Sequence, residues 1–229
     1  MEGDAEDANL PGSLPTLRQS AIAFSKENEE ELPARIDRLW YINPYGQEIP
    51  VSANPKAVSV LYGAEALIYS IGSLYTSIIP CLILRGVGDA IVQTATLRHK
   101  ILILNGSLDR ETGPKNKALG AVDFVRALVK AGEQGRGRKM VDGEDDDWLW
   151  RKYVTHVIYV EGLGTPIVDR ERLNMAGVEC IRCWGRKAED GTMRFDERGL
   201  KGALEAVLGK GERGEGRSRR NTMENYVIG

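Results

Sequence analysis

Short, continuous apolar runs alternate with segments of helical periodicity along most of the chain. The apolar runs, which predict buried strands, are residues 66–71 (ALIYSI), 100–105 (KILILN), 153–160 (YVTHVIYV) and 178–184 (VECIRCW). The segments that predict helices are residues 54–64, 76–86, 87–95, 117–132, 170–177 and 196–209. Strands that are apolar at consecutive positions are typical of parallel sheets covered on both faces. We therefore predict an α/β, Rossmann-like fold with a mainly parallel sheet and helices on both faces.

Several segments lie outside this alternation. Residues 1–34 are polar, acidic and interrupted by proline, which predicts a disordered lead to an α/β domain spanning 35–209. Residues 36–51 predict a hairpin, because the sequence NPYG suits a tight turn. Residues 133–147 are charged and glycine-rich, which predicts a mobile insertion. Residues 210–229 form a tail that is basic up to Arg220, and we predict that it is disordered.

Residues 66–84 carry no charge, and a stretch of this length could span a membrane. Small, polar or helix-breaking residues occupy its middle, namely Gly72, Ser73, Thr76, Ser77 and Pro80. A span should be most apolar at this point, so the pattern favours a strand that ends at Gly72 and a helix that begins near Thr76.

A strand that turns into a helix at this point presents free backbone N–H groups at the helix start. Gly72 allows close backbone approach, and the hydroxyls of Ser73, Thr76 and Ser77 add donors. This combination suits a phosphate or another anion, but the same hydroxyls could simply cap the helix. In parallel sheets ligands bind beyond the carboxyl ends of the strands, and Asn105 ends the second predicted strand.

Composition narrows the class of protein. The chain has 229 residues, of which 42% are hydrophobic and 28% charged, as in ordinary globular domains. Its formal net charge of -2 argues against a nucleic-acid partner, and its acidic start argues against a secretory signal. Three cysteines are too few for a disulfide framework, so we expect a cytoplasmic protein.

The cysteines and histidines give little support for a metal site. Cys180 and Cys183 have the spacing of a redox or zinc pair, but residues three apart on a strand face opposite ways. We therefore expect buried thiols. His99 and His156 lie far apart in the sequence, and no ligand spacing connects them.

The run SIGSLYTSIIPCLIL, residues 70–84, resembles the CofD/YvcK family of 2-phospho-L-lactate transferases and gluconeogenesis-factor-like (UPF0052-type) proteins. Ile71 stands where the family commonly has proline, and Cys81 where it commonly has asparagine. The likeness covers residues 40–208 and is closer to the YvcK-like branch. The family's glycine-rich GGGTG loop and its DDGG-like acidic motif have no counterpart in the sequence. The resemblance is therefore to the C-terminal portion of a family member, and we expect an incomplete domain that lacks the N-terminal half.

The resemblance implies a nucleotide diphosphate ligand, of the GDP or UDP type, with Mg²⁺ assisting in the transferases. The residues implied to line the nucleotide or its phosphates are Gly72, Ser73, Leu74, Tyr75, Thr76 and Ser77. Those implied to contact substrate or metal are Asn105, Asp109 and Glu111. A structural role is the alternative in each case, because Tyr75 could be a core residue, Asn105 could bridge loop backbone, and Asp109 and Glu111 could be solvated.

Three functions remain open on these grounds. The chain could be a transferase of the 2-phospho-L-lactate type, a non-catalytic regulatory protein that binds a UDP-sugar, or a truncated fragment without activity. We expect ligand binding rather than catalysis, and no catalytic residue is assigned. The expected partner is a small-molecule nucleotide, with no nucleic acid and no membrane. A half-domain should also expose a sheet edge, so we expect a homodimer or poor solubility.

Overall fold

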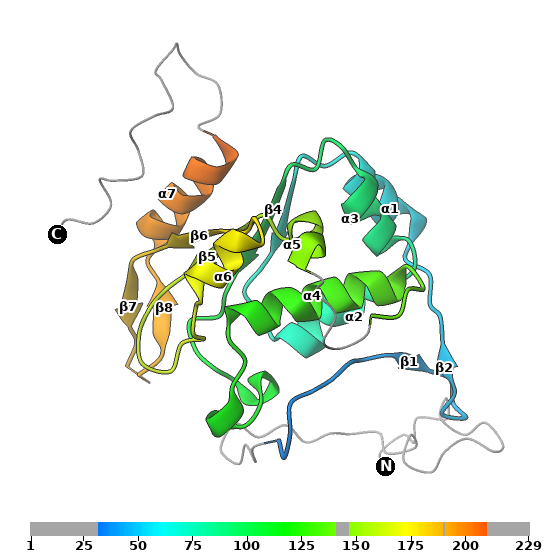
Figure 1. The fold of residues 1–229 in the computed structure, drawn as a ribbon, viewed down its shortest axis with the longest axis horizontal. Helices are drawn as coiled ribbons and strands as arrows, with labels where there is room; N and C mark the ends of the chain where they lie inside the picture. Colours follow the sequence, from blue (N-terminus) through cyan, green and yellow to red (C-terminus); the bar gives the residue numbers. More distant parts are fainter. Residues whose placement is uncertain (1–31, 141–146, 190, 210–229) are drawn as a thin grey trace, which may run out of the picture.

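A four-stranded parallel sheet forms the centre of the fold (Figure 1). The computed structural model describes residues 32–140, 147–189 and 191–209. The strands are β3 (Ala66–Tyr69), β4 (His99–Ile103), β5 (His156–Tyr159) and β6 (Glu179–Arg182), and they lie side by side in this order. The parallel pairing confirms the predicted fold class.

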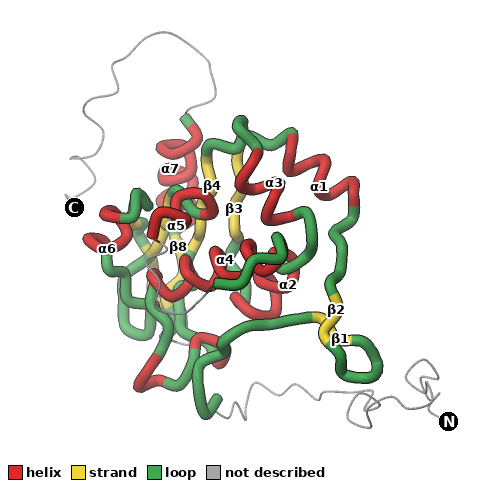
Figure 2. Tube along the Cα trace, turned by 45° about the vertical axis from the view of Figure 1, so that its right-hand side comes forward, coloured by secondary structure: helices red, strands yellow, loops and turns green. Residues whose placement is uncertain are grey.

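Side chains of β4, β5 and β6 alternate between two hydrophobic cores, one on each face of the sheet. On β4, Leu102 belongs to the larger core and Ile101 to the smaller one, and both are almost completely buried. Continuous apolar runs are therefore needed because both faces are covered. The larger core is formed with α2 (Ile79–Leu82), α3 (Val87–Gln93), α4 (Ala121–Gly135), α5 (Asp147–Tyr153) and α6 (Arg170–Met175). Helix α7 (Glu197–Leu208) packs in the smaller core on the opposite face (Figures 1 and 2).

The segment before β3 forms the predicted hairpin and the predicted first helix. Strand β1 (Tyr41–Ile42) pairs antiparallel with β2 (Glu48–Ile49), and Gly46 takes a positive φ in the turn between them. Helix α1 (Pro55–Tyr62) begins where expected, because the Asn54 side chain accepts a hydrogen bond from the Lys56 N–H.

The prediction of a mobile insertion at 133–147 is wrong at the ends that the structure describes. Helix α4 continues through Gly135, and the Glu133 side chain is buried. Its carboxylate accepts hydrogen bonds of 2.6 Å from both the Tyr153 hydroxyl and the Arg136 guanidinium, which explains how a charged residue continues the helix. Residues 141–146, most of residues 1–34 and residues 210–229 lie outside the described residues, so the disorder predicted there stays a prediction.

The start of the third predicted strand is also corrected. Tyr153 ends helix α5, and strand β5 begins only at His156. Trp150 and Tyr153 are fully buried on the inner side of α5, which packs against α4, so Tyr153 belongs to this helix and not to the strand. The arrangement is a tertiary override of local β-propensity.

A second hairpin follows β6. Strand β7 (Gly185–Lys187) pairs with β8 (Met193–Phe195), and neither strand is predicted by the sequence pattern. Before this hairpin, Cys180 in β6 packs in the larger core, and Cys183, directly after β6, packs in the smaller core. Burial raises the pKa of each thiol to about 11, as expected for unreactive cysteines.

Strand β3 is an edge of the sheet, and it is only partly covered. Ile68 lies opposite Ile101 in the register, but 40% of its surface is exposed, whereas Ile101 is fully buried. The expected homodimer would use such an edge, and it stays a prediction. Among the described residues, no helix has the length and apolar character that a membrane span requires.

Candidate functional site

The segment that follows β3 makes an unusual helical turn. Ser73 has extended backbone, and a π-helical turn, η3 (Leu74–Ile78), begins directly after it and runs into α2. The Ile79 N–H donates to the Leu74 carbonyl, which is the five-residue spacing of a π-helix. The Ser73 side chain does not cap this turn. The helix start therefore needs other acceptors for its N–H groups.

Glu111 supplies those acceptors. Its Oε2 accepts hydrogen bonds from the Tyr75 N–H at 2.8 Å and from the Thr76 N–H at 3.1 Å. Glu111 belongs to η4 (Arg110–Thr112), a 3₁₀ turn in the loop after β4. An oxyanion thus lies against the backbone N–H groups that the sequence suggested as an anion site. In this structure the oxyanion is a carboxylate of the protein itself.

Asp109 joins the same two segments. Its Oδ2 lies 3.4 Å from the Ser73 hydroxyl and 3.5 Å from the Asn105 amide nitrogen, and its Oδ1 accepts the Thr112 N–H at 3.0 Å. Burial raises the pKa of the Asp109 carboxyl above its usual value, although the hydrogen bond from Thr112 acts in the opposite direction. Oδ2 is thus a partly desolvated carboxylate oxygen with only long contacts, which is the kind of atom that a cation or a ligand hydrogen-bond donor would contact.

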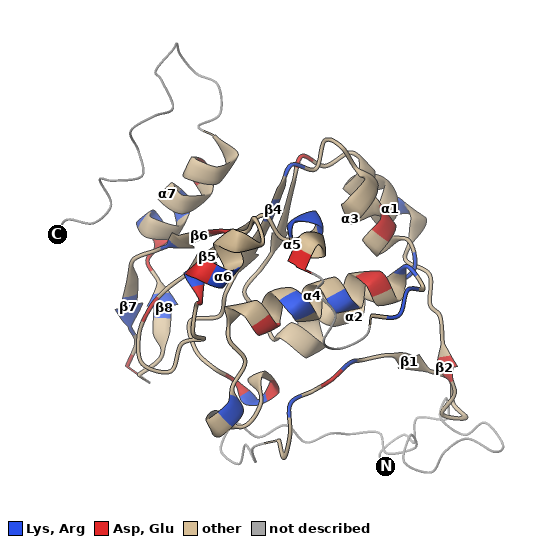
Figure 3. Cartoon of the chain, in the orientation of Figure 1, with Lys and Arg blue, Asp and Glu red and all other residues tan. Residues whose placement is uncertain are grey.

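The structure therefore brings together residues that lie up to 38 positions apart in the sequence. Ser73, Asn105, Asp109 and Glu111 meet at the carboxyl ends of β3 and β4, where the parallel topology predicts a ligand site. The surrounding loop after β4 carries both acidic and basic residues (Figure 3). We call this group the β3–β4 cluster.

The other residues implied by the resemblance differ in whether their side chains are exposed to solvent. The side chains of Leu74 and Tyr75 are almost fully buried, and the Tyr75 hydroxyl donates to the Ile36 carbonyl. Burial raises the pKa of Tyr75 to about 12. These two residues offer only their backbone to a ligand. Thr76 and Ser77 are exposed, and Gly72 lies so that a Cβ on it would touch the Ser77 side chain.

Sequence reasoning did not identify what else surrounds this edge of the sheet. The Leu108 N–H donates to the Gly164 carbonyl at 2.7 Å, so the loop after β5 lies beside the loop after β4. The β7–β8 hairpin also contacts the loop after β4, because the Met193 N–H donates to the Gly106 carbonyl. A side chain at Gly106 would overlap the Met193 backbone, and Gly followed by a polar residue was the only signal for this approach.

The two histidines, which no sequence spacing connects, lie close together on neighbouring strands. The ring centroids of His99 and His156 are 6.1 Å apart, and burial lowers the pKa of His156. Among the residues that the structure describes, no group of three His, Cys, Asp or Glu side chains is arranged to hold a metal ion. A cation at the β3–β4 cluster would need ligand or water oxygens in addition to Asp109.

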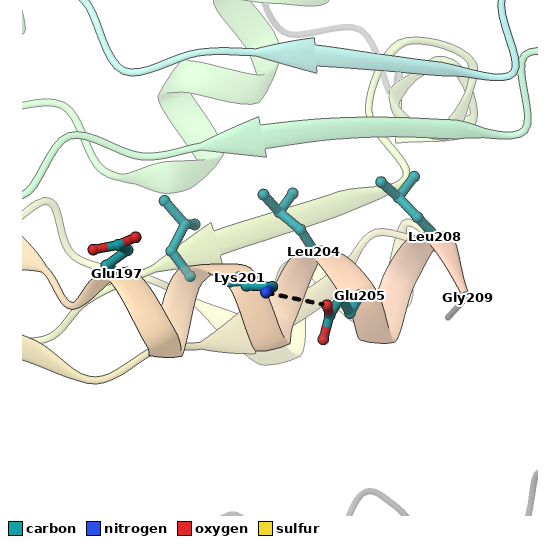
Figure 4. Close-up of a pocket in the computed structure, with 7 residues that line it drawn as sticks. Glu197, Lys201, Leu204, Glu205, Leu208 and Gly209 are labelled. Carbon is teal, nitrogen blue, oxygen red and sulfur yellow. Dashed lines mark ion pairs between the residues drawn. The ribbon is translucent and has the colours of Figure 1, made fainter. Parts of the chain in front are cut away.

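A groove of about 350 Å³ runs along α7, and its lining is mainly apolar. Its lining residues are Glu197, Leu200, Lys201, Leu204, Glu205, Leu208 and Gly209. Leu204 and Leu208 point toward the strands, whereas Lys201 and Glu205 pair with each other on the solvent side (Figure 4). The lining is mainly aliphatic, and its cation, Lys201, is paired with Glu205.

Comparison with known proteins identifies the family. Residues 12–182 match the family described as 2-phospho-L-lactate transferase CofD. The chain belongs to the CofD family. This confirms the resemblance seen in the GSLYTSIIP run.

Two known proteins show how far the likeness extends. An uncharacterized protein of Saccharomyces cerevisiae, YNL011C, is 33% identical over 184 residues, which cover 78% of this chain and 40% of the yeast protein. The crystal structure of protein BH3568 from Bacillus halodurans superposes with a TM-score of 0.51 at 20% identity, over 69% of this chain and 47% of that one. The latter likeness shows the fold alone. This CofD-family chain thus spans less than half the length of either protein.

Proposed function

We propose that this CofD-family chain binds the diphosphate group of a nucleotide at the β3–β4 cluster. The observation that carries the proposal is the contact of the Glu111 carboxylate with the Tyr75 and Thr76 N–H groups. It supports the view that this helix start accepts an oxyanion, since a carboxylate oxygen and a phosphate oxygen make similar hydrogen bonds to N–H groups. π-Helical turns are rare and frequently occur at functional sites, which supports the same assignment.

Ligand binding at these N–H groups requires Glu111 to move. A phosphate oxygen and the carboxylate oxygen are both negative, and they compete for the same two donors. The Ser73 and Asn105 side chains lie beside the donors and would hold the remaining phosphate oxygens. Thr76 and Ser77, both exposed, would add hydroxyl donors.

A magnesium ion fits the donor chemistry of the cluster. Mg²⁺ is commonly bound by one or two carboxylates together with phosphate oxygens and waters. Asp109 would hold it through Oδ2, the partly desolvated oxygen with only long contacts, together with phosphate and water oxygens. The ion would supply charge neutralisation for the diphosphate. Without it, two carboxylates beside the ligand would oppose binding.

Calorimetric titration of the chain with GDP and with UDP, in the presence of Mg²⁺, tests the proposal directly. We expect heat of binding with at least one nucleotide, weakened at least tenfold by Ser73→Ala combined with Asp109→Asn. Glu205→Gln, on α7 and outside the cluster, is the matched control and should leave binding unchanged. Absence of binding for both nucleotides would overturn the proposal.

Transfer of a 2-phospho-L-lactate-type group is the second candidate function, and the family match supports it. Backbone N–H groups and a divalent cation aligned on a diphosphate are also what such a transfer requires. Incubation with a nucleotide-linked phospholactate donor and a deazaflavin-type acceptor, followed by chromatography of the products, distinguishes transfer from binding alone. Nucleotide binding without product would leave a regulatory binding protein as the function.

A further inference from the structure

A single leucine stands out on the loop between β5 and α6. Leu163 is 90% exposed, and it lies at the tip of a turn between Gly162 and Gly164, the latter with a positive φ. The turn is closed by Thr165, whose hydroxyl donates to the Gly162 carbonyl at 2.9 Å. A large apolar side chain is therefore held in water by a hydrogen-bonded turn.

The turn is fastened to its surroundings on both sides. The Gly164 carbonyl accepts the Leu108 N–H at 2.7 Å, and the Ile167 carbonyl accepts the Ala121 N–H at 2.8 Å. Leu108 directly precedes Asp109 of the β3–β4 cluster. The backbone that displays Leu163 is thus hydrogen-bonded to the loop that carries the polar residues of the proposed site.

Ligand sites combine a few placed polar groups with a larger apolar lining. The β3–β4 cluster provides the polar groups, Ser73, Asn105 and Asp109, but these three side chains offer no apolar surface to the rest of a nucleotide. The flat face of a nucleobase is a surface that a leucine side chain can cover.

We propose that Leu163 contacts the nucleobase of a nucleoside diphosphate bound at the β3–β4 cluster. This inference rests on the proposed function and adds the residue that distinguishes a nucleotide from a bare diphosphate. The contact orients the base and strengthens binding of the whole nucleotide, but it leaves the diphosphate contacts unchanged.

Calorimetry of the full chain with GDP, UDP and inorganic pyrophosphate, each with Mg²⁺, tests the contact. We expect Leu163→Ser to weaken the nucleoside diphosphates about fivefold, equivalent to about 1 kcal/mol, and to change pyrophosphate binding by less than twofold. Leu163→Met, which keeps an apolar side chain, should retain the nucleotide affinity. Because Leu163 is exposed, thermal unfolding of both variants should match that of the wild-type chain.

Met175→Ser is the matched control. Met175 is 76% exposed and ends α6, which precedes β6 and so lies toward the amino ends of the strands. It should affect none of the three ligands. Equal loss of pyrophosphate and nucleotide binding in Leu163→Ser, or no loss of nucleotide binding, would overturn the contact while the proposed function stands. A wild-type chain that binds pyrophosphate as tightly as the nucleotides would overturn it too. Absence of all binding to the wild-type chain would overturn both proposals.

Discussion

The contact between Glu111 and the start of η3 predicts that one substitution changes stability and affinity in opposite directions. In Glu111→Gln, the carboxylate that accepts the Tyr75 and Thr76 N–H groups becomes a neutral amide. A hydrogen bond to a charged group contributes about 1.5–3 kcal/mol and a neutral one about 0.5–1.5 kcal/mol. Glu111 is partly exposed, so the lower values apply. We expect the substitution to lower the free energy of unfolding by about 1–1.5 kcal/mol.

The stability lost in Glu111→Gln should appear as an increased affinity for the nucleotide. If a diphosphate must displace the Glu111 side chain from the two N–H groups, weakening that contact removes part of the opposition to binding. A change of about 1.4 kcal/mol corresponds to a tenfold change in the dissociation constant. We therefore expect Glu111→Gln to bind the nucleotide about tenfold more tightly than the wild-type chain.

Urea denaturation followed by circular dichroism gives the first quantity, and calorimetric titration the second. Glu205→Gln is again the control, because Glu205 is exposed and its 4.0 Å pair with Lys201 should contribute less than about 0.5 kcal/mol. Lower stability together with weaker nucleotide binding would refute displacement, since it would mean that the carboxylate assists the ligand. Unchanged stability would show that the two hydrogen bonds contribute nothing measurable.

Three further predictions concern stability near the cluster and at the end of α4. Asp109→Asn should raise the free energy of unfolding by about 0.5 kcal/mol or more at pH 7. The pKa of Asp109 is raised in the folded state, so the wild-type chain loses stability as pH rises above the usual value of 3.8. Urea denaturation at pH 3 and pH 7 should show the gain only at pH 7, and a loss of stability at pH 7 would contradict this. Glu133→Gln should cost about 2–4 kcal/mol at pH 7. The net pKa of Glu133 is lowered, burial being outweighed by the hydrogen bonds from Tyr153 and Arg136, so the wild-type chain should lose this stability as pH falls below 4.5, and the variant should lack that slope. Gly132→Ala should cost about 1–3 kcal/mol because a methyl group there overlaps the buried Tyr153 ring, and a thermal unfolding midpoint equal to that of the wild-type chain would exclude the overlap.

Much of the sheet could be predicted from the sequence because each strand obeys a rule that is local. The runs around Leu102 and Ile181 are apolar at neighbouring positions, since the two faces of the sheet are covered by different cores. Asn54 likewise predicts the start of α1, because its capping hydrogen bond is local and needs no tertiary contact. Boundaries that depend on distant partners were not predictable in this way.

The end of α4 shows why. Glu133 follows an apolar helical pattern with charge and glycine, which is the composition of a loop. It is nevertheless helical because its carboxylate accepts a hydrogen bond from the hydroxyl of Tyr153, twenty residues later, at the end of α5. The loop expected at Glu133 and the strand expected at Tyr153 were both wrong because these two residues stabilise each other, and neither signal exists in one segment alone.

The candidate site combines both situations. The carboxyl-edge rule for parallel sheets correctly brought the segment after β3 beside the segment after β4, because that proximity follows from strand pairing alone. The same rule says nothing about which atoms meet. Whether the Tyr75 N–H faces solvent or a carboxylate depends on the 3₁₀ turn that positions Glu111. Asp109 stabilises this turn, because its side chain accepts the Thr112 N–H and the Thr112 hydroxyl accepts the Asp109 N–H. Asp109, which contacts Ser73, thus also positions Glu111, which accepts the neighbouring Tyr75 and Thr76 N–H groups. Any ligand that draws Asp109 toward itself should loosen Glu111 as well, so that the site opens through the side chain that binds the ligand.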